Sequence, residues 1–201
     1  MSIEKLENSI GGVDIYLLDQ ILKKRYSKDA VILDAGCGEG RNLKWFYKNN
    51  IECFGVDSNG SKIEIAKSTY TKQATHFSIQ NLDVLNFKND TFDHVICNAV
   101  LHFAQNTQHF FNMLSELIRV LKPGGSIFIR MTSNIGIEKR IKNVGDGIYY
   151  LPDNTNRFLI TPDLVQSLLT KFPISFLEPL KTVNVNNMRS MSTMLLQKDN
   201  I

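Results

Sequence analysis

A glycine-rich stretch between residues 31 and 42 constrains this chain more than any other feature. Three apolar residues lead into Asp34, and glycines then stand at every second position, 36, 38 and 40. This order predicts a buried strand over 30–34, a tight loop, and a helix over 41–48. Glycine permits a backbone with positive φ and a close approach of a ligand, and the start of a helix offers unpaired N–H groups. The stretch therefore predicts a cofactor-binding loop.

The composition excludes several classes of protein. The chain has 201 residues and a net charge of +3, from 23 basic and 20 acidic residues. This length fits a single domain over 1–201, and the balanced charge argues against a nucleic-acid or membrane-surface partner. No apolar run reaches the length of a membrane span of about 18 residues. The amino end lacks a signal-peptide pattern, and three cysteines without CxxC spacing predict reduced thiols, no metal site and a cytoplasmic protein.

The order of the predicted elements indicates an α/β fold. Strand-like and helix-like segments alternate five times, which specifies a Rossmann-like doubly wound sheet with parallel strands and helices on both faces. Two further strand-like segments, 174–185 and 191–197, flank Asn186-Asn187 and predict an antiparallel C-terminal hairpin. The expected sheet therefore has seven strands, mostly parallel. Its first five strands are predicted over 30–34, 51–56, 76–79, 92–97 and 126–131.

Polar residues stand at the ends of four of the predicted strands. Asp34, Asp57, Asp83 and Asn98 each lie at or just past such an end. In open parallel sheets, ligands bind outside the carboxyl ends of the strands. These four side chains are therefore expected to meet around one ligand.

Two segments fall outside the regular alternation. Residues 1–28 are expected to form an N-terminal helical cap, with Asp14 capping a helix. Residues 132–160 have no clear periodicity, and so long a segment in a compact domain predicts a lid or substrate-binding element. A helix capped by Thr161 and ending before Pro173 follows this segment, and Thr107 is expected to cap an earlier one.

The glycine loop is compatible with two cofactors. The dinucleotide fingerprint G-x-G-x-x-G requires its third glycine at position 41, for packing of the helix on the strand. Here the third glycine comes one residue early, at Gly40, and Arg41 follows. The match to a nicotinamide dinucleotide site is imperfect, so an NAD-dependent oxidoreductase remains an alternative.

The chain resembles the class I S-adenosylmethionine-dependent methyltransferases. Five segments of this chain resemble the family's motifs in sequence: Leu33–Gly40, Phe54–Asp57, Asp83, Phe92–Asn98 and Leu121–Gly125. The five motifs occur in the family order, and the resemblance spans roughly residues 14–131. The family's antiparallel last strand also matches the predicted C-terminal hairpin.

This resemblance implies S-adenosylmethionine as methyl donor and S-adenosylhomocysteine as product. It assigns Asp57 to the ribose hydroxyls, Asp83 to the adenine amino group, and the loop with Asp34 and Asn98 to the amino acid end. The implied cofactor residues are Asp34, Gly36, Cys37, Gly38, Gly40, Arg41, Asn42, Asp57, Ser58, Asp83, Val84 and Asn98.

The absence of a nucleobase-methyltransferase motif narrows the possible classes of methyl acceptor. Methyltransferases of nucleobase amino groups resemble one another in an Asn/Asp-Pro-Pro-aromatic motif, whereas this chain reads Asn98-Ala99-Val100-Leu101. The resemblance is greatest to small-molecule methyltransferases, which predicts a small-molecule acceptor and a monomer or homodimer. A non-catalytic S-adenosylmethionine-binding partner subunit remains a further alternative. The candidate acceptor residues are Asp14, Tyr16, His102, Arg130, Tyr149 and Arg157.

His102 is the candidate catalytic base, because it follows the fourth strand, where a base would lie near the methyl group. Packing of this side chain beneath the lid is an equally open reading.

Overall fold

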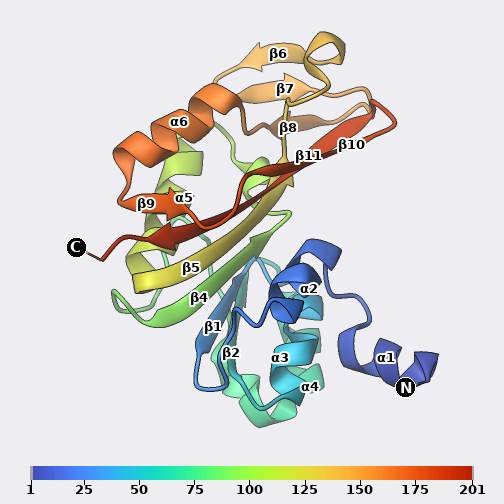
Figure 1. The fold of residues 1–201 in the computed structure, drawn as a ribbon, viewed down its shortest axis with the longest axis vertical. Coiled ribbons are helices and arrows are strands. Elements are labelled where there is room, and N and C mark those ends of the chain that lie inside the picture. Colours follow the sequence, from blue (N-terminus) through green and yellow to red (C-terminus); the bar gives the residue numbers. More distant parts are fainter. Residues whose placement is uncertain (1, 201) are drawn as a thin grey trace.

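The computed structural model describes residues 2–200, and Met1 and Ile201, the two ends of the predicted domain, lie outside this range. One large twisted sheet runs through the molecule (Figure 1). Seven strands follow one another in the order β10-β11-β5-β4-β1-β2-β3, and β9 pairs with β11 beside this row. Their bounds are β1 Val31–Ala35, β2 Glu52–Asp57, β3 Phe77–Ile79, β4 Phe92–Asn98, β5 Leu121–Thr132, β9 Ile174–Phe176, β10 Lys181–Val185 and β11 Arg189–Lys198.

The directions of the strands confirm the expected fold class. β1, β2, β3, β4 and β5 pair in parallel, whereas β11 runs antiparallel to both β5 and β10. Because the parallel strands share one direction, their carboxyl ends lie at one edge of the sheet. That edge carries the residues discussed below.

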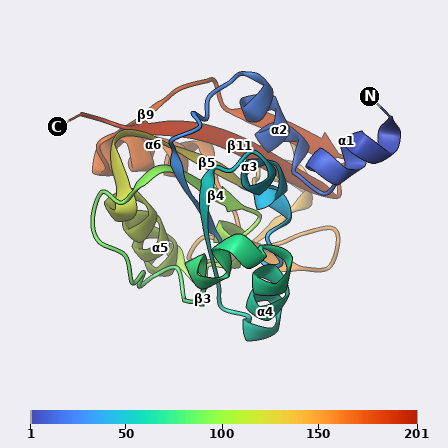
Figure 2. The same ribbon diagram turned by 90° about the horizontal axis from the view of Figure 1, so that it is seen from below.

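Helices cover both faces of the sheet (Figures 1 and 2). Side chains alternate along each strand, so Leu33 and Val95 pack toward α5 and α6, whereas Ile32 and Ile96 pack toward α2, α3 and α4. The two faces thus bury two separate apolar cores. The helices are α1 Ile3–Ile10, α2 Ile15–Leu22, α3 Lys44–Lys48, α4 Gly60–Thr69, α5 Thr107–Val120 and α6 Pro162–Lys171, with short 3₁₀ turns η1 Arg41–Leu43, η2 Thr71–His76, η3 Leu101–Phe103 and η4 Glu138–Arg140.

Several predicted boundaries require correction. The helix expected over 41–48 begins as the 3₁₀ turn η1, because the Leu43 N–H donates to the Gly40 carbonyl at 2.8 Å, a three-residue closure. Asn106, rather than Thr107, caps α5, since its side chain accepts from the His109 N–H at 2.7 Å. β5 starts at Leu121 and so includes the expected turn 122–125.

The C-terminal segments also differ in part from expectation. The strand expected over 174–185 is interrupted into β9 and β10 around Pro179, which cannot donate a hydrogen bond to a sheet. Thr161 caps α6 as expected, accepting from the Leu164 N–H at 3.1 Å.

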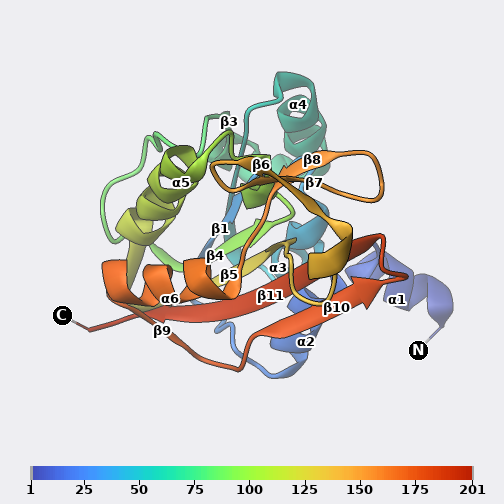
Figure 3. The ribbon, with the colours of Figure 1, turned by 90° about the horizontal axis from the view of Figure 1, so that it is seen from above.

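The segment 132–160 is more regular than its sequence suggests. It contains a second, antiparallel sheet of β6 Lys142–Gly145, β7 Ile148–Tyr150 and β8 Asn156–Phe158. This small sheet lies beyond the carboxyl end of β5 (Figures 1 and 3). β8 is anchored to the main body through Phe158, whose ring stacks on Phe110 of α5 with centroids 4.7 Å apart.

The N-terminal segment lies on the outside of the molecule (Figures 1 and 2). No residue of α1 is buried. Three basic side chains hold the segment by binding backbone carbonyls: Arg41 binds Gly12, Lys44 binds Glu7, and Lys48 binds Asn8. α1 is therefore attached by exposed polar contacts rather than by a shared core.

Removal of residues 1–12 should leave the fold intact. Because the removed helix contains no buried residue, we expect the melting temperature to fall by less than about 4 °C, equivalent to about 1 kcal/mol. Circular dichroism and thermal unfolding measure this. Leu17→Ala is the contrast, since Leu17 is fully buried in α2 and its truncation should cost about 2–5 kcal/mol. Global unfolding on removal of residues 1–12 would contradict the assignment.

Candidate cofactor and acceptor site

The glycine loop is held against the end of β2. The N–H groups of Gly36 and Cys37 both donate to the Val56 carbonyl, at 2.8 and 2.9 Å. The Gly38 N–H donates to the Asp57 carboxylate at 2.9 Å. These three bonds join the loop after β1 to the last residues of β2, so the two motifs form one structure.

The three glycines of the loop have different roles. A Cβ on Gly36 would lie 2.3 Å from Val100, and one on Gly40 would lie 2.5 Å from the Tyr70 ring. Gly36 and Gly40 are therefore required for packing. A Cβ on Gly38 would meet nothing closer than the Lys62 side chain at 3.8 Å. Gly38 is the one that leaves open space in front of the backbone.

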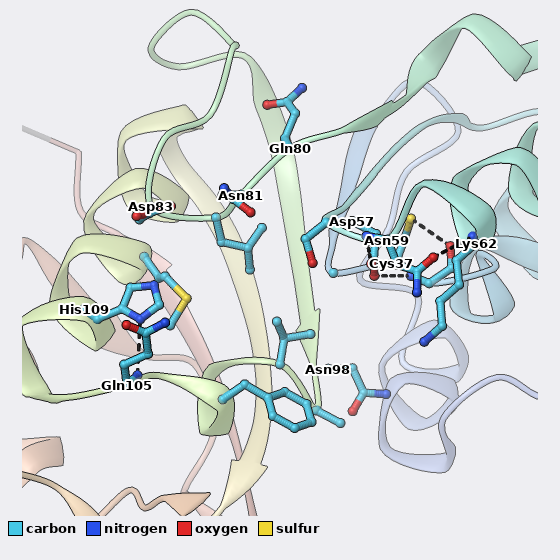
Figure 4. A pocket seen from close by; sticks show the side chains of 18 of the residues that line it. Cys37, Asp57, Asn59, Lys62, Gln80, Asn81, Asp83, Asn98, Gln105 and His109 are labelled. Carbon is cyan, nitrogen blue, oxygen red and sulfur yellow. Dashed lines mark hydrogen bonds between the residues drawn. The ribbon is translucent and has the colours of Figure 1, made fainter.

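A cavity of about 1040 Å³ opens in front of this loop. Figure 4 shows Cys37, Asp57 and Asn59 on one side and Gln105 and His109 on the other. A volume of this size suits a nucleotide-sized ligand. Nine of the residues predicted to bind a cofactor line it: Gly36, Cys37, Gly38, Arg41, Asn42, Asp57, Ser58, Asp83 and Asn98.

The other three predicted cofactor residues do not line the cavity. Asp34 is buried at the end of β1, with 1% of its surface exposed. Gly40 packs on Tyr70, whose hydroxyl donates to the Gly40 carbonyl at 2.6 Å. Val84 is 70% exposed.

Two buried polar side chains at this edge lack partners. Both carboxylate oxygens of Asp34 and both amide atoms of Asn98 make no hydrogen bond to the described residues. Burial raises the pKa of Asp34 to about 7, the positive charge of Arg41 acting in the opposite direction. A buried polar group without a partner costs about 1–3 kcal/mol, so this edge is prepared for a polar or charged ligand.

The Cys37 thiol is not a reactive group. Burial raises its pKa, and the charges of Asp34 and Asp57 act in the same direction. Cys37 therefore stays protonated and serves as a small residue of the loop.

One wall of the cavity was missed by sequence reasoning. It is formed by polar residues of and before α5, which the amphipathic pattern assigns to a solvated helix face. A polar helix face toward solvent and one toward a polar cavity have the same sequence pattern. The missed lining residues are Glu39, Asn59, Lys62, Gln80, Asn81, Leu82, Ala99, Val100, Phe103, Gln105, Asn106, Gln108, His109, Asn112 and Met113.

Three of the predicted acceptor residues lie together beside the cofactor edge. The Arg130 guanidinium lies 3.4 Å from the Asp14 carboxylate and 5.1 Å from the centre of the Tyr16 ring. Asp14 also caps α2 by accepting from the Tyr16 N–H at 2.9 Å. Its backbone N–H in turn donates to the Asn42 side chain at 3.1 Å, which connects this group to the glycine loop.

The remaining acceptor candidates divide between two places. His102 in η3 is buried, and burial lowers its pKa to about 4. Arg157 on β8 lies over the neighbouring Phe103 ring, 5.0 Å from its centre. Tyr149 on β7 is the register partner of Arg157, and it packs against the apolar cluster that contains Leu151 and Leu159.

Residues 2–200 contain neither a candidate membrane-spanning helix nor a candidate metal site. No helix in this range is both long and apolar enough to cross a bilayer. No group of three or more histidine, cysteine, aspartate or glutamate side chains in the same range could hold a metal ion.

The sheet order, the glycine loop and the acidic end of β2 define a Rossmann-like nucleotide-binding domain. Residues 33–129 match the family model described as a methyltransferase domain. A S-adenosylmethionine-dependent methyltransferase from Methanosarcina mazei superimposes with a TM-score of 0.74 at 19% identity, covering 90% of this chain and 98% of that one. Residues 33–129 therefore belong to the methyltransferase-domain family, and the chain shares its fold with a S-adenosylmethionine-dependent methyltransferase.

Curated relatives match over about half of this chain. "Probable tRNA methyltransferase 9B" from Homo sapiens is 32% identical over 100 residues, 50% of this chain and 21% of that protein. A ubiquinone biosynthesis O-methyltransferase from Coxiella burnetii is 28% identical over 99 residues, 48% of this chain and 41% of that protein. The chain thus spans less than half the length of these relatives.

The residues present fit the family cofactor, S-adenosylmethionine. Its amino acid end carries an ammonium and a carboxylate, and the unpartnered Asp34 and Asn98 offer an anion and an amide in the same place. The open backbone at Gly38 leaves room for the ligand.

Asp57→Ala should weaken binding of S-adenosylhomocysteine by about tenfold or more, because charge-assisted hydrogen bonds would be lost and the Gly38 N–H would lose its acceptor. Isothermal titration calorimetry measures the affinity. Glu52→Ala is the matched control, since Glu52 is an exposed acid at the opposite end of the same strand. Near-normal affinity of Asp57→Ala would refute the role assigned to Asp57.

Asp34→Asn should change how stability depends on pH. Between the ordinary pKa of 3.8 and the folded pKa of about 7, the folded protein keeps a proton that the unfolded chain releases. The wild-type free energy of unfolding therefore falls by up to about 4 kcal/mol as pH rises through this window. The variant has no carboxyl group at this position and should not show this decrease. Urea unfolding of both proteins at about pH 5 and about pH 8 measures the difference. Parallel pH dependence would mean that Asp34 is ionised at no cost in the folded state.

Proposed function

We propose that this chain transfers a methyl group from S-adenosylmethionine to a small-molecule acceptor and releases S-adenosylhomocysteine. The observation that carries the proposal is the pair of buried, unpartnered side chains, Asp34 and Asn98, beside a cavity of about 1040 Å³. When bound, the cofactor supplies a methyl group on a positively charged sulfur. The protein has to hold the two reactants in line and exclude water.

Each part of the cofactor has proposed partners. Asp57, with Ser58 beside it, binds the ribose hydroxyls, and Asp83 binds the adenine. The loop backbone at Gly38 and the Asp34 carboxylate bind the amino acid end. The support is that the Asp57 carboxylate already accepts two backbone N–H groups, from Gly38 and Asn59 at 2.9 Å each, and is thereby fixed in orientation.

The acceptor site is proposed to lie where the segments 1–28 and 132–160 approach the carboxyl edge of the sheet. Asp14, Tyr16 and Arg130 contribute from one side, and His102 and Arg157 from the other. The neutral His102 imidazole, with an unpartnered Nδ1 atom, is the candidate base if the acceptor group carries a proton. Tyr149 contributes indirectly, through the packing of the small sheet.

A small molecule is favoured over RNA as acceptor. The 23 basic and 20 acidic residues are nearly balanced, and a nucleic-acid surface requires clustered positive charge. The tRNA methyltransferase relative matches over 21% of its own length. We further propose a cytoplasmic location without membrane attachment, supported by three buried free cysteines, and a monomer or homodimer.

Two other functions make different predictions. An NAD-dependent oxidoreductase would bind NAD rather than S-adenosylhomocysteine, and Arg41 in place of the third fingerprint glycine speaks against it. A non-catalytic partner subunit would bind S-adenosylhomocysteine but transfer no methyl group.

Incubation with methyl-labelled S-adenosylmethionine and a fractionated cell extract tests the proposal. We expect label to enter the low-molecular-mass fraction, and Asp57→Ala to abolish this transfer. Label in tRNA would refute the small-molecule acceptor, and binding of S-adenosylhomocysteine without any transfer would favour the partner subunit. Calorimetry with NAD and S-adenosylhomocysteine separates the oxidoreductase from both.

A further inference from the structure

A row of polar side chains crosses the sheet beside the cofactor edge. Asn98, Arg130 and Thr193 are register partners on the adjacent strands β4, β5 and β11, and Lys181 on β10 continues the row. Register partners point to the same face of a sheet. Asn98 lines the cofactor cavity, so Arg130 is the next side chain along the row from the cofactor.

Polar atoms in this region are buried without partners. The Arg130 Nε, the His102 Nδ1 and the Asn134 side-chain oxygen make no hydrogen bond to the described residues. His102 itself is 6% exposed. Each such atom costs about 1–3 kcal/mol unless a ligand satisfies it. His102 lies four residues past the end of β4 and Asn134 two residues past the end of β5, so both are at the sheet edge where an acceptor would lie.

The local charges are not balanced. η3, which carries His102, contacts both β8, which carries Arg157, and β5, which carries Arg130. Burial lowers the pKa of His102, and the charges of Arg157, Arg189 and Arg130 act in the same direction. Asp14 lies against Arg130, and Asp153 is hydrogen-bonded to Arg189 through both Nε and a terminal nitrogen. Two of the three guanidinium groups therefore have a carboxylate partner among the described residues.

Of these three guanidinium groups, Arg157 is the one without a carboxylate partner within residues 2–200. It donates to the Asn156 carbonyl at 2.7 Å and lies over the Phe103 ring. Phe103 lines the cofactor cavity. The uncompensated positive charge is therefore next to the cavity rather than on a remote surface.

We propose that the methyl acceptor carries a single carboxylate, which Arg157 and Arg130 bind. Guanidinium groups bind carboxylates through paired, charge-assisted hydrogen bonds, and one uncompensated positive charge matches a monoanion better than a dianionic phosphate. The His102 Nδ1 and the Asn134 side chain remain to orient the polar group that receives the methyl. This inference rests on the proposed methyl transfer and specifies its acceptor.

The test uses the whole protein saturated with S-adenosylhomocysteine. Calorimetry first establishes that the cofactor product binds; if it does not, the proposed function fails. The saturated protein is then titrated with three matched sets of hydroxyl- or amino-bearing compounds: 4-hydroxybenzoate, anthranilate and 3-hydroxybutyrate, each beside its uncharged primary amide. 4-Hydroxyphenyl phosphate is the dianionic comparison.

We expect at least one acid to bind at least about tenfold more tightly than its amide, a difference of about 1.4 kcal/mol. Arg157→Gln should remove this preference while leaving the affinity for S-adenosylhomocysteine unchanged. Arg157→Lys, which keeps the charge but loses the planar fork, should retain part of it. Arg140→Gln is the matched control, because Arg140 is an exposed arginine of the same 132–160 segment and its replacement should change nothing.

Four outcomes would overturn the inference while leaving the proposed function intact. They are equal affinity for acids and amides, absence of binding by all three acids, tighter binding of the phosphate ester, or an equal effect of Arg157→Gln and Arg140→Gln. Because Arg157 is partly exposed and on a peripheral strand, its variants are expected to fold, which thermal unfolding checks. Arg130→Gln is a second variant that should weaken the same acid.

Discussion

The cofactor site depends on the attachment of the glycine loop to β2. Two N–H groups share the Val56 carbonyl and a third reaches the Asp57 carboxylate. These bonds use the donors of the loop that point toward β2, and the turn they impose places Gly38 with nothing in front of it but the Lys62 side chain. The cavity, the orientation of Asp57 and the start of η1 all follow from this attachment.

The same edge of the sheet buries polar side chains without hydrogen-bond partners, which is unfavourable in the free protein. Parallel strands end side by side, so Asp34 on β1 and Asn98 on β4 are both buried next to the cavity without partners. Burial raises the pKa of Asp34 to about 7. A cofactor ammonium would restore the charged form, so the unfavourable burial in the free protein becomes favourable in the complex. The buried Asp34 thus lowers the stability of the free protein at the position where it would bind the cofactor.

The proposed acceptor side is built differently from the cofactor side. Its polar groups come from distant parts of the chain: α2, the turn after β4, the end of β5 and the small sheet. Asp14 connects the two sides, because its N–H binds Asn42 of the loop region while its carboxylate faces Arg130. A change in the N-terminal segment can therefore affect both cofactor and acceptor through one residue.

Local periodicity, together with the strand ends that a parallel sheet brings to one edge, was enough to predict the parallel sheet, the glycine loop and nine of the residues that line the cavity. Short-range patterns misplaced the cap of α5 by one residue and missed the small sheet at 142–158, whose strands of three and four residues are too short for a period to register. The folded molecule alone shows that the polar face of α5 lines a cavity and that Gly40 and Val84 do not. It also shows that Arg157 binds a backbone carbonyl and an aromatic ring and has no carboxylate partner among residues 2–200. The physical reason is that burial and charge pairing are properties of side chains meeting across the fold, and a linear pattern does not specify which partners meet.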